Sequence, residues 1–120
     1  MNAKTAEFQS KILERTFNFS ENLIKVVVKL PNNSVNEVLR KQVIRSGTSI
    51  GANYREACEA ESTKDFVHKL RISKKESRET EYWLELILRV NPNSTTFFQE
   101  LINESKEFTK IFSSIIKKFI

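Results

Sequence analysis

Apolar residues recur at intervals of three and four along almost the whole chain, which is the period of a helix that buries one face. Short polar or proline-containing breaks separate four such stretches. The breaks are Pro31-Asn32-Asn33-Ser34, a turn at Glu61-Ser62, and Asn91-Pro92-Asn93-Ser94. The pattern predicts helices over residues 5–29, 35–61, 63–90 and 95–119.

Capping signals mark where two of these helices begin. Ser34 is followed three residues later by Glu37, which forms the sequence of a capping box. Ser62 followed by Asp65 repeats an N-cap signature at the start of the third helix. The connections are short, and short connections favour antiparallel neighbours. The sequence therefore predicts an all-α, antiparallel up-down-up-down four-helix bundle that forms a single domain over residues 1–120.

Both glycines of the chain, Gly47 and Gly51, lie inside the predicted second helix. A glycine in a helix interior costs about 1 kcal/mol relative to alanine. Two glycines four residues apart lie on the same face, so they indicate that another backbone passes close to the second helix there.

A polar face runs beside the glycines. On the second helix it consists of Gln42, Ser46, Ser49, Asn53 and Glu56, spaced four, three, four and three. On the third helix Ser73, Ser77 and Glu81 interrupt the apolar stripe. A turn near residue 61 would bring Ser46 to Ser77 and Ser49 to Ser73, and would allow Arg45 to pair with Glu81. We call these residues the polar seam.

The polar seam has three possible interpretations. Buried polar groups are tolerated when they are satisfied, and a satisfied network fixes the register of two helices. The first interpretation is therefore a hydrogen-bonded contact between small residues. A ligand or ion site between the helices and a polar contact between subunits are the alternatives.

Charge and composition narrow the class of protein. The 120 residues carry 20 lysines and arginines against 15 acidic residues, a net charge of +5. This balance is compatible with nucleic-acid partners, although net charge alone is weak support. The N-terminus lacks the apolar region of a secretory signal, and no stretch approaches the length of a membrane span, so we expect a cytoplasmic protein. A single cysteine excludes an internal disulfide and a cysteine metal cluster.

Cations line one face of the predicted third helix. The basic line is Lys64, His68, Arg71, Lys75 and Arg78, spaced four, three, four and three, and it continues to Tyr82 and Arg89. Such a line can neutralise phosphates without reading bases, and Tyr82 could stack on an unpaired base. The alternative is an ordinary solvated surface of the bundle.

The fourth helix has a wider apolar arc than one bundle contact requires. Its additional apolar residues include Phe98, Phe112 and Ile116, and the first helix shows a similar excess. Trp83 flanks the apolar stripe of the third helix. Because soluble proteins rarely expose large apolar patches, we expect these residues at a subunit interface. A generously packed monomer core is the alternative.

Catalytic motifs are absent from the sequence. His68 is the only histidine, and no cysteine or carboxylate is spaced to share a metal ion with it. Glu56 and Glu81 do not belong to the Glu-x-x-His motifs of metal-binding bundles. There is no glycine-rich phosphate loop, nucleophile elbow or dinucleotide fingerprint. The sequence predicts no enzymatic activity, metal or cofactor.

The segment from Arg45 to Ala57, followed by Phe66 to Leu84, resembles the four-helix-bundle family named for the protein encoded in the intervening sequence of bacterial 23S rRNA genes. The most specific portions are Ser49-Ile50-Gly51-Ala52-Asn53 with Glu56, and Ser73, Ser77 and Glu81 with Tyr82-Trp83-Leu84. Many relatives carry proline where Gly51 stands and glycine where Ala57 stands, which concerns local helix geometry and not the fold.

The resemblance implies a homo-oligomeric ring, a pentamer, and a distant relationship to the accessory protein of diversity-generating retroelements, which works with a reverse transcriptase and nucleic acid. No enzymatic activity is established for the family. We therefore expect a non-enzymatic, self-assembling protein that associates with RNA. A purely structural oligomer with a protein partner is the competing hypothesis, and a small ligand bound at the polar seam is a third.

Overall fold

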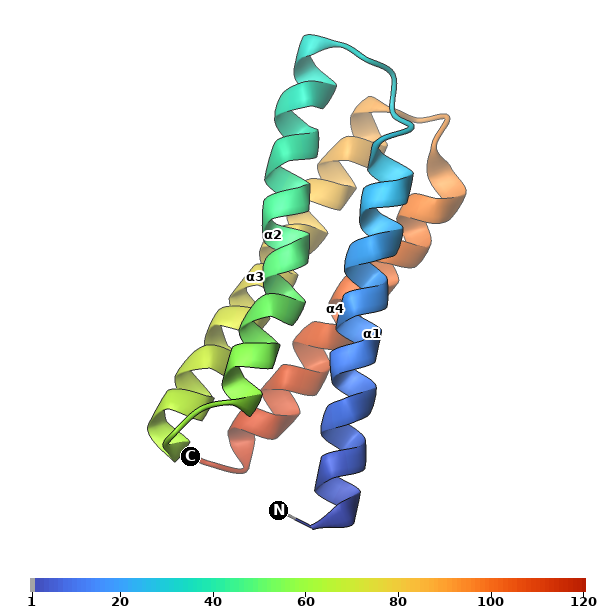
Figure 1. The fold of residues 1–120 in the computed structure, drawn as a ribbon. Coiled ribbons are helices and arrows are strands. Elements are labelled where there is room, and N and C mark those ends of the chain that lie inside the picture. The colour runs from blue at the N-terminus through green and yellow to red at the C-terminus, as the bar shows by residue number, and fades with distance from the viewer. Residues whose placement is uncertain (1) are drawn as a thin grey trace.

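Four helices run alternately up and down along one long axis (Figure 1), as the sequence predicted. They are α1 (Ala3–Val27), α2 (Ser34–Cys58), α3 (Thr63–Val90) and α4 (Thr95–Lys117). The computed structural model describes residues 2–120, without the side chains of Thr95 and Thr96, and this part of the chain contains no strand. Its principal extents are 47 × 22 × 19 Å. In Figure 1, α1 and α2 lie at the front, and α3 and α4 lie behind them.

Side chains cap the first three helices at their N-termini. The side chain of Asn2 accepts from the backbone N–H of Thr5, and Ser62 accepts from Asp65 at 3.1 Å. The cap of α2 is Asn33, whose side chain accepts from the Asn36 N–H at 2.8 Å. The expected capping box at Ser34 is therefore wrong by one residue. Asn33 precedes Ser34 and has the extended backbone that an N-cap requires.

The second helix ends earlier than expected, at Cys58 instead of near Glu61. Its last turn tightens, because the N–H of Glu59 bonds to the carbonyl of Glu56 and the N–H of Ala60 bonds to that of Ala57. These i to i+3 bonds satisfy carbonyls that have no partner further along the helix. The chain then has a short connection in which to reverse before Ser62.

Aromatic rings from three helices form the centre of the core. Phe19 of α1 meets Phe108 of α4 edge to face, with ring centroids 5.4 Å apart. Phe108 stacks on Phe112, and Phe112 lies 5.8 Å from Tyr54 of α2. All four rings are buried, so one contiguous core joins the helices.

The burial of α4 corrects one expectation from the sequence. Phe98, Phe112 and Ile116 are buried inside the chain, with at most 5% of each residue exposed. They cannot supply surface for contacts between subunits. The wide apolar arc of α4 is covered within the chain by α3 on one side and by the core residues of α1 and α2 on the other.

The glycine positions bring α2 close to α1. A Cβ atom at Gly51 would lie 2.9 Å from Thr16 Oγ1, 3.1 Å from Thr16 Cβ and 3.4 Å from the backbone carbonyl carbon of Thr16. A Cβ at Gly47 would collide with the Leu23 side chain. The backbone expected near the second helix is therefore that of α1.

Within residues 2–120, no helix combines the length and the apolar character needed to cross a membrane.

Replacing Gly51 with leucine tests the close approach. The larger side chain would be forced against the backbone of Thr16, so we expect the free energy of unfolding to fall by about 1–3 kcal/mol. Chemical denaturation measures this change. Lys41→Leu is the matched control, since Lys41 is an exposed position of the same helix. Equal stability of the Gly51→Leu and Lys41→Leu variants would contradict the steric argument.

Candidate nucleic-acid interface

The polar seam between α2 and α3 is hydrogen-bonded within the chain. Ser46, Ser73, Ser77 and Thr80 are all fully buried. The hydroxyls of Thr80 and Ser46 share a hydrogen bond of 2.9 Å across the two helices. Ser73 donates to the carbonyl of Ile50 at 3.0 Å, also across the helices. The polar seam therefore fixes the register of α2 against α3, as the first interpretation proposed.

Two details of the polar seam differ from the expectation. Ser46 bonds with Thr80 instead of Ser77, whose hydroxyl donates to the carbonyl of Ser73 in its own helix. The sequence analysis missed Thr80, although it lies three residues after Ser77 and continues the four-three spacing of Ser73 and Ser77. Because threonine is β-branched and can also pack as an apolar residue, spacing alone does not mark its hydroxyl as part of the polar seam.

The outer members of the polar seam bond locally or to surface partners. Asn53 donates to the carbonyl of Ser49 at 2.9 Å, and Ser49 donates to the carbonyl of Arg45 at 2.7 Å. Glu56 is exposed and pairs with Lys69 at 3.0 Å. Gln42 accepts from Arg45 at 3.3 Å. These outer members are therefore held by partners within the chain.

Arg45 pairs with two carboxylates of α3, neither of which is the expected Glu81. Its guanidinium lies 3.6 Å from Glu76 and forms an ion pair with Glu79. The indole N–H of Trp83 donates to the same Glu79 carboxylate at 2.9 Å. Residues 76, 79 and 83 follow the side of α3 that faces α2, whereas Glu81 lies on another side of the helix.

Opposite pKa shifts follow from the surroundings of the two carboxylates. Burial, and next the charge of Glu79, raise the pKa of Glu76, and one oxygen of Glu76 is buried without a hydrogen bond. The hydrogen bond from Trp83, and next that from Arg45, lower the pKa of Glu79. Ionised Glu76 is thus poorly stabilised, while ionised Glu79 is well stabilised.

The basic line lies on the outer face of α3. Its members and their two extensions, Lys64, His68, Arg71, Lys75, Arg78, Tyr82 and Arg89, are all exposed. Within residues 2–120, none of its lysines or arginines lies within ion-pair distance of a carboxylate. Glu76 and Glu79 turn toward Arg45 instead. The positive charge of the basic line therefore faces solvent.

The structure adds lysines of α4 that the sequence analysis missed. Lys106, Lys110 and Lys117 are exposed on the outer face of that helix. Phe66 of α3 meets Phe119 at 5.4 Å, which sets the antiparallel register of the two helices. On this register Lys117 lies level with His68 and Lys110 with Lys75. Their spacing of four and seven residues, which places all three on one helical face, could have identified them in the sequence. We call the basic line and these three lysines the basic face.

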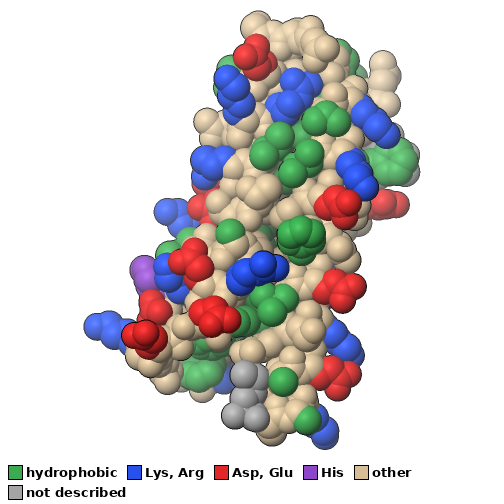
Figure 2. All heavy atoms as spheres, in the orientation of Figure 1, with side chains coloured by type: hydrophobic (Ala, Val, Ile, Leu, Met, Phe, Trp, Pro, Cys, Tyr) green, Lys and Arg blue, Asp and Glu red, His purple; other side chains and the backbone are tan. Residues whose placement is uncertain are grey.

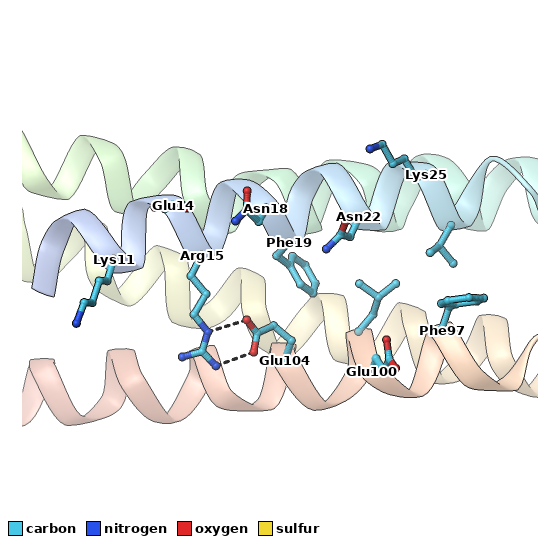
Figure 3. A pocket seen from close by; sticks show the side chains of 12 residues that line it. Lys11, Glu14, Arg15, Asn18, Phe19, Asn22, Lys25, Phe97, Glu100 and Glu104 are labelled. Atoms are coloured by element: carbon cyan, nitrogen blue, oxygen red, sulfur yellow. Dashed lines mark hydrogen bonds and ion pairs between the residues drawn. The ribbon is translucent and has the colours of Figure 1, made fainter.

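A hollow of about 780 Å³ lies between α1 and α4. Arg15 of α1 reaches across it and donates two hydrogen bonds to Glu104 of α4, at 2.7 and 2.6 Å (Figure 3). The same hydrogen bonding raises the pKa of Arg15. The two charged groups neutralise each other, and no cluster of three metal-ligating side chains occurs among the described residues.

The opposite pKa shifts of Glu76 and Glu79 predict opposite changes in stability when each carboxylate is replaced by a neutral amide. The folded state holds a proton on Glu76 more tightly than the unfolded state does, so ionisation of Glu76 destabilises the fold as the pH rises above about 4.5. We expect Glu76→Gln to raise the melting temperature at pH 7. The gain should shrink toward pH 4, where the wild-type carboxyl is protonated as well.

Glu79→Gln is the matched control, with the opposite sign. The folded state favours ionised Glu79, and that stabilisation is present above pH 4.5 and lost as the pH falls. We expect this variant to lower the melting temperature at pH 7. Thermal melts of both variants from pH 4 to pH 7 provide the measurement. Two shifts of the same sign at pH 7 would contradict the assigned environments.

Comparisons with known proteins agree with the resemblance seen in the sequence. A crystal structure from Bacteroides thetaiotaomicron VPI-5482, described as a protein with unknown function from the S23 ribosomal protein family, superposes with a TM-score of 0.81. The two chains are 42% identical, and the match covers 88% of this chain and 98% of that chain. A comparison with curated proteins found no match. The family model described as 23S rRNA-intervening sequence protein matches residues 9–114, and this chain belongs to that family.

Proposed function

We propose that this protein is a non-enzymatic RNA-binding module that assembles with copies of itself and contacts RNA through the basic face. The observation that carries the proposal is the exposed line of cations on α3, in which no lysine or arginine is paired with a carboxylate among the described residues. Lys69, on the neighbouring face of the same helix, is already paired with Glu56. The contrast distinguishes the basic line from an ordinary surface with alternating ion pairs.

The geometry of the basic line suits a phosphate backbone. From Lys64 to Arg78 the helix extends roughly 21 Å at about 1.5 Å per residue. Cations at every turn over this length can neutralise several phosphates, and lysines level with them on α4 widen the contact. Such contacts release counterions and require no particular base sequence. RNA binding of this kind would be sensitive to salt and largely independent of sequence.

The family adds support of a different kind. Its description names an intervening sequence of 23S rRNA, and the similar crystal structure is described as a member of a ribosomal protein family. We take these names as pointing toward an RNA or ribonucleoprotein partner for this chain. A protein partner, with the basic face serving solubility, is the competing outcome.

Self-assembly would use the outer side of α1 and α2. Phe17 and Val28 leave 61% and 56% of their surfaces exposed, and Ile24 leaves 39%. Beside them Leu13, Gly51 and Ala52 line a mostly apolar hollow. Figure 2 shows hydrophobic side chains gathered along this face between flanking charges. A second copy of the chain is the occupant we propose, since an uncovered patch of this kind is unusual in a soluble monomer.

The two surfaces lie on opposite sides of the bundle. In Figure 1, α1 and α2 form the front layer, and α3 and α4 form the back layer. Copies joined through the front layer would keep their basic faces in solvent. A closed ring, such as the pentamer that the resemblance implies, would multiply the phosphate contacts available to one RNA molecule.

The RNA proposal predicts the behaviour of a triple variant. Replacing Arg71, Lys75 and Arg78 with glutamine should weaken binding to labelled structured RNA by about tenfold or more at low salt. The slope of log affinity against log salt is negative, and it should become shallower by about two. Fluorescence anisotropy at two or more salt concentrations measures both quantities.

The control for this experiment is a second triple variant with the same change in net charge. Lys11 and Lys25 are exposed on α1 and Lys29 is exposed just after it, all away from the basic face. Their replacement by glutamine should leave RNA affinity nearly unchanged. If both triple variants lost the same RNA affinity, binding would depend on net charge alone and not on the basic face. No binding by the wild type at low salt would favour a protein partner.

Assembly predicts a change of mass in a single variant. Phe17→Glu would place a charge in the proposed contact, so we expect the assembly to dissociate to the 14.0 kDa chain. Light scattering coupled to gel filtration measures the mass. Val35→Glu is the control, because Val35 is 57% exposed near the start of α2, outside the apolar hollow. A wild-type protein that is monomeric at micromolar concentrations would overturn this part of the proposal.

A further inference from the structure

A small hollow lies at the end of the bundle where α3 begins and the chain leaves α4. Thr63, Lys64, Val67, His68, Arg71 and Phe119 line it. The first three members of the basic line are among these residues. The hollow therefore lies at one end of the basic line and differs from the rest of it by having an apolar wall.

That wall is an aromatic ring held in place from one side. Phe119 meets Phe66 edge to face, with centroids 5.4 Å apart and an interplanar angle of 64°. Phe66 packs against the core, yet Phe119 leaves 46% of its surface exposed. Val67, which is half-buried, extends the apolar surface. An exposed ring supported in this way can receive a second flat group.

The opposite wall is cationic and lacks carboxylates. Lys64, His68 and Arg71 follow each other at one-turn spacing and are exposed. The nearest acidic residue in the sequence is Asp65, which lines a separate hollow together with Glu56 and Glu59. Positive charge and an exposed aromatic ring thus meet in one place, and acidic side chains gather in another.

We propose that this hollow binds one unpaired nucleotide of an RNA strand, with the base against Phe119 and Val67 and the phosphate against Lys64 and Arg71. This inference rests on the proposed RNA function. A base inside a duplex cannot offer its flat face, whereas an unpaired base can stack on an aromatic side chain. The strand continues from the hollow along Lys75 and Arg78. The basic face then prefers RNA that contains a single-stranded segment.

The test compares one RNA sequence in two forms. Anisotropy is measured with a labelled single strand and with the same sequence in a blunt duplex, for the wild type and for Phe119→Leu. Leucine keeps an apolar group against Phe66 but removes the aromatic face. We expect the variant to lose about tenfold in affinity for the single strand and to keep its affinity for the duplex. Phe119→Trp should restore single-strand binding.

Phe97→Leu is the matched control, because Phe97 is also an exposed phenylalanine, but it belongs to α4 and lies beside α1. It should bind both RNA forms as the wild type does. Equal losses for strand and duplex in Phe119→Leu would overturn the stacking role. Unchanged single-strand affinity in Phe119→Leu would also overturn the stacking role. If the triple variant of Arg71, Lys75 and Arg78 fails to bind in that case, the RNA function stands without this subsite.

Two further outcomes decide the ligand. If adenosine 5′-monophosphate alone binds as tightly as the strand, the site takes a free nucleotide and the strand proposal is overturned. If the wild type binds neither RNA form, the proposed function fails, and the subsite fails with it.

Discussion

Two buried hydrogen bonds, one between the hydroxyls of Ser46 and Thr80 and one from Ser73 to the carbonyl of Ile50, determine how α3 is rotated against α2. Apolar contacts alone would tolerate sliding and rotation, because their energy depends weakly on direction. In another register the buried hydroxyl of Ser73 would lose the carbonyl of Ile50, and a hydroxyl buried without a partner costs about 1–3 kcal/mol, so one register is favoured. That register turns Glu76 and Glu79 toward Arg45 and leaves the basic line facing outward. The charge pattern of the surface therefore depends on polar groups that no solvent reaches.

The two halves of the bundle are joined differently. At Gly51 the absence of a side chain lets α1 approach α2 closely, with Thr16 as the nearest residue. Between α1 and α4 the contact is sparse, and the bidentate pair of Arg15 with Glu104 crosses an open hollow. A carboxylate and a guanidinium in this geometry add direction to a contact that has little packing. The bundle is thus closed by close backbone packing on three sides, whereas α1 and α4 are joined by this polar bridge and by the contact of Phe19 with Phe108.

Much of the fold could be predicted from the sequence because helical periodicity and short breaks leave few alternatives. The number and order of the helices, the antiparallel arrangement and the approximate register of α2 and α3 all follow from local patterns. The errors concern choices between neighbouring residues. Asn33 and Ser34 are both good caps, and only the backbone conformation selects Asn33. Arg45 can reach several carboxylates, and helix rotation decides that it meets Glu76 and Glu79. The width of an apolar arc also does not reveal its partner: Phe98, Phe112 and Ile116 serve the core of this chain. Lys106, Lys110 and Lys117 became relevant only when the structure placed α4 beside the basic line.

The sparse contact between α1 and α4 has a consequence for motion. Regions with few buried contacts open locally at lower free energy than the rest of a fold, and their amides exchange with solvent sooner. By this measure we expect α1 to detach first, since its backbone packs closely on α2 and only sparsely on α4. Helix α1 and its C-cap carry the exposed apolar side chains Phe17, Ile24 and Val28. A neighbouring copy bound to these side chains would hold α1 against the bundle. The free energy needed to open α1 would then be a property of the assembly and not of the single chain.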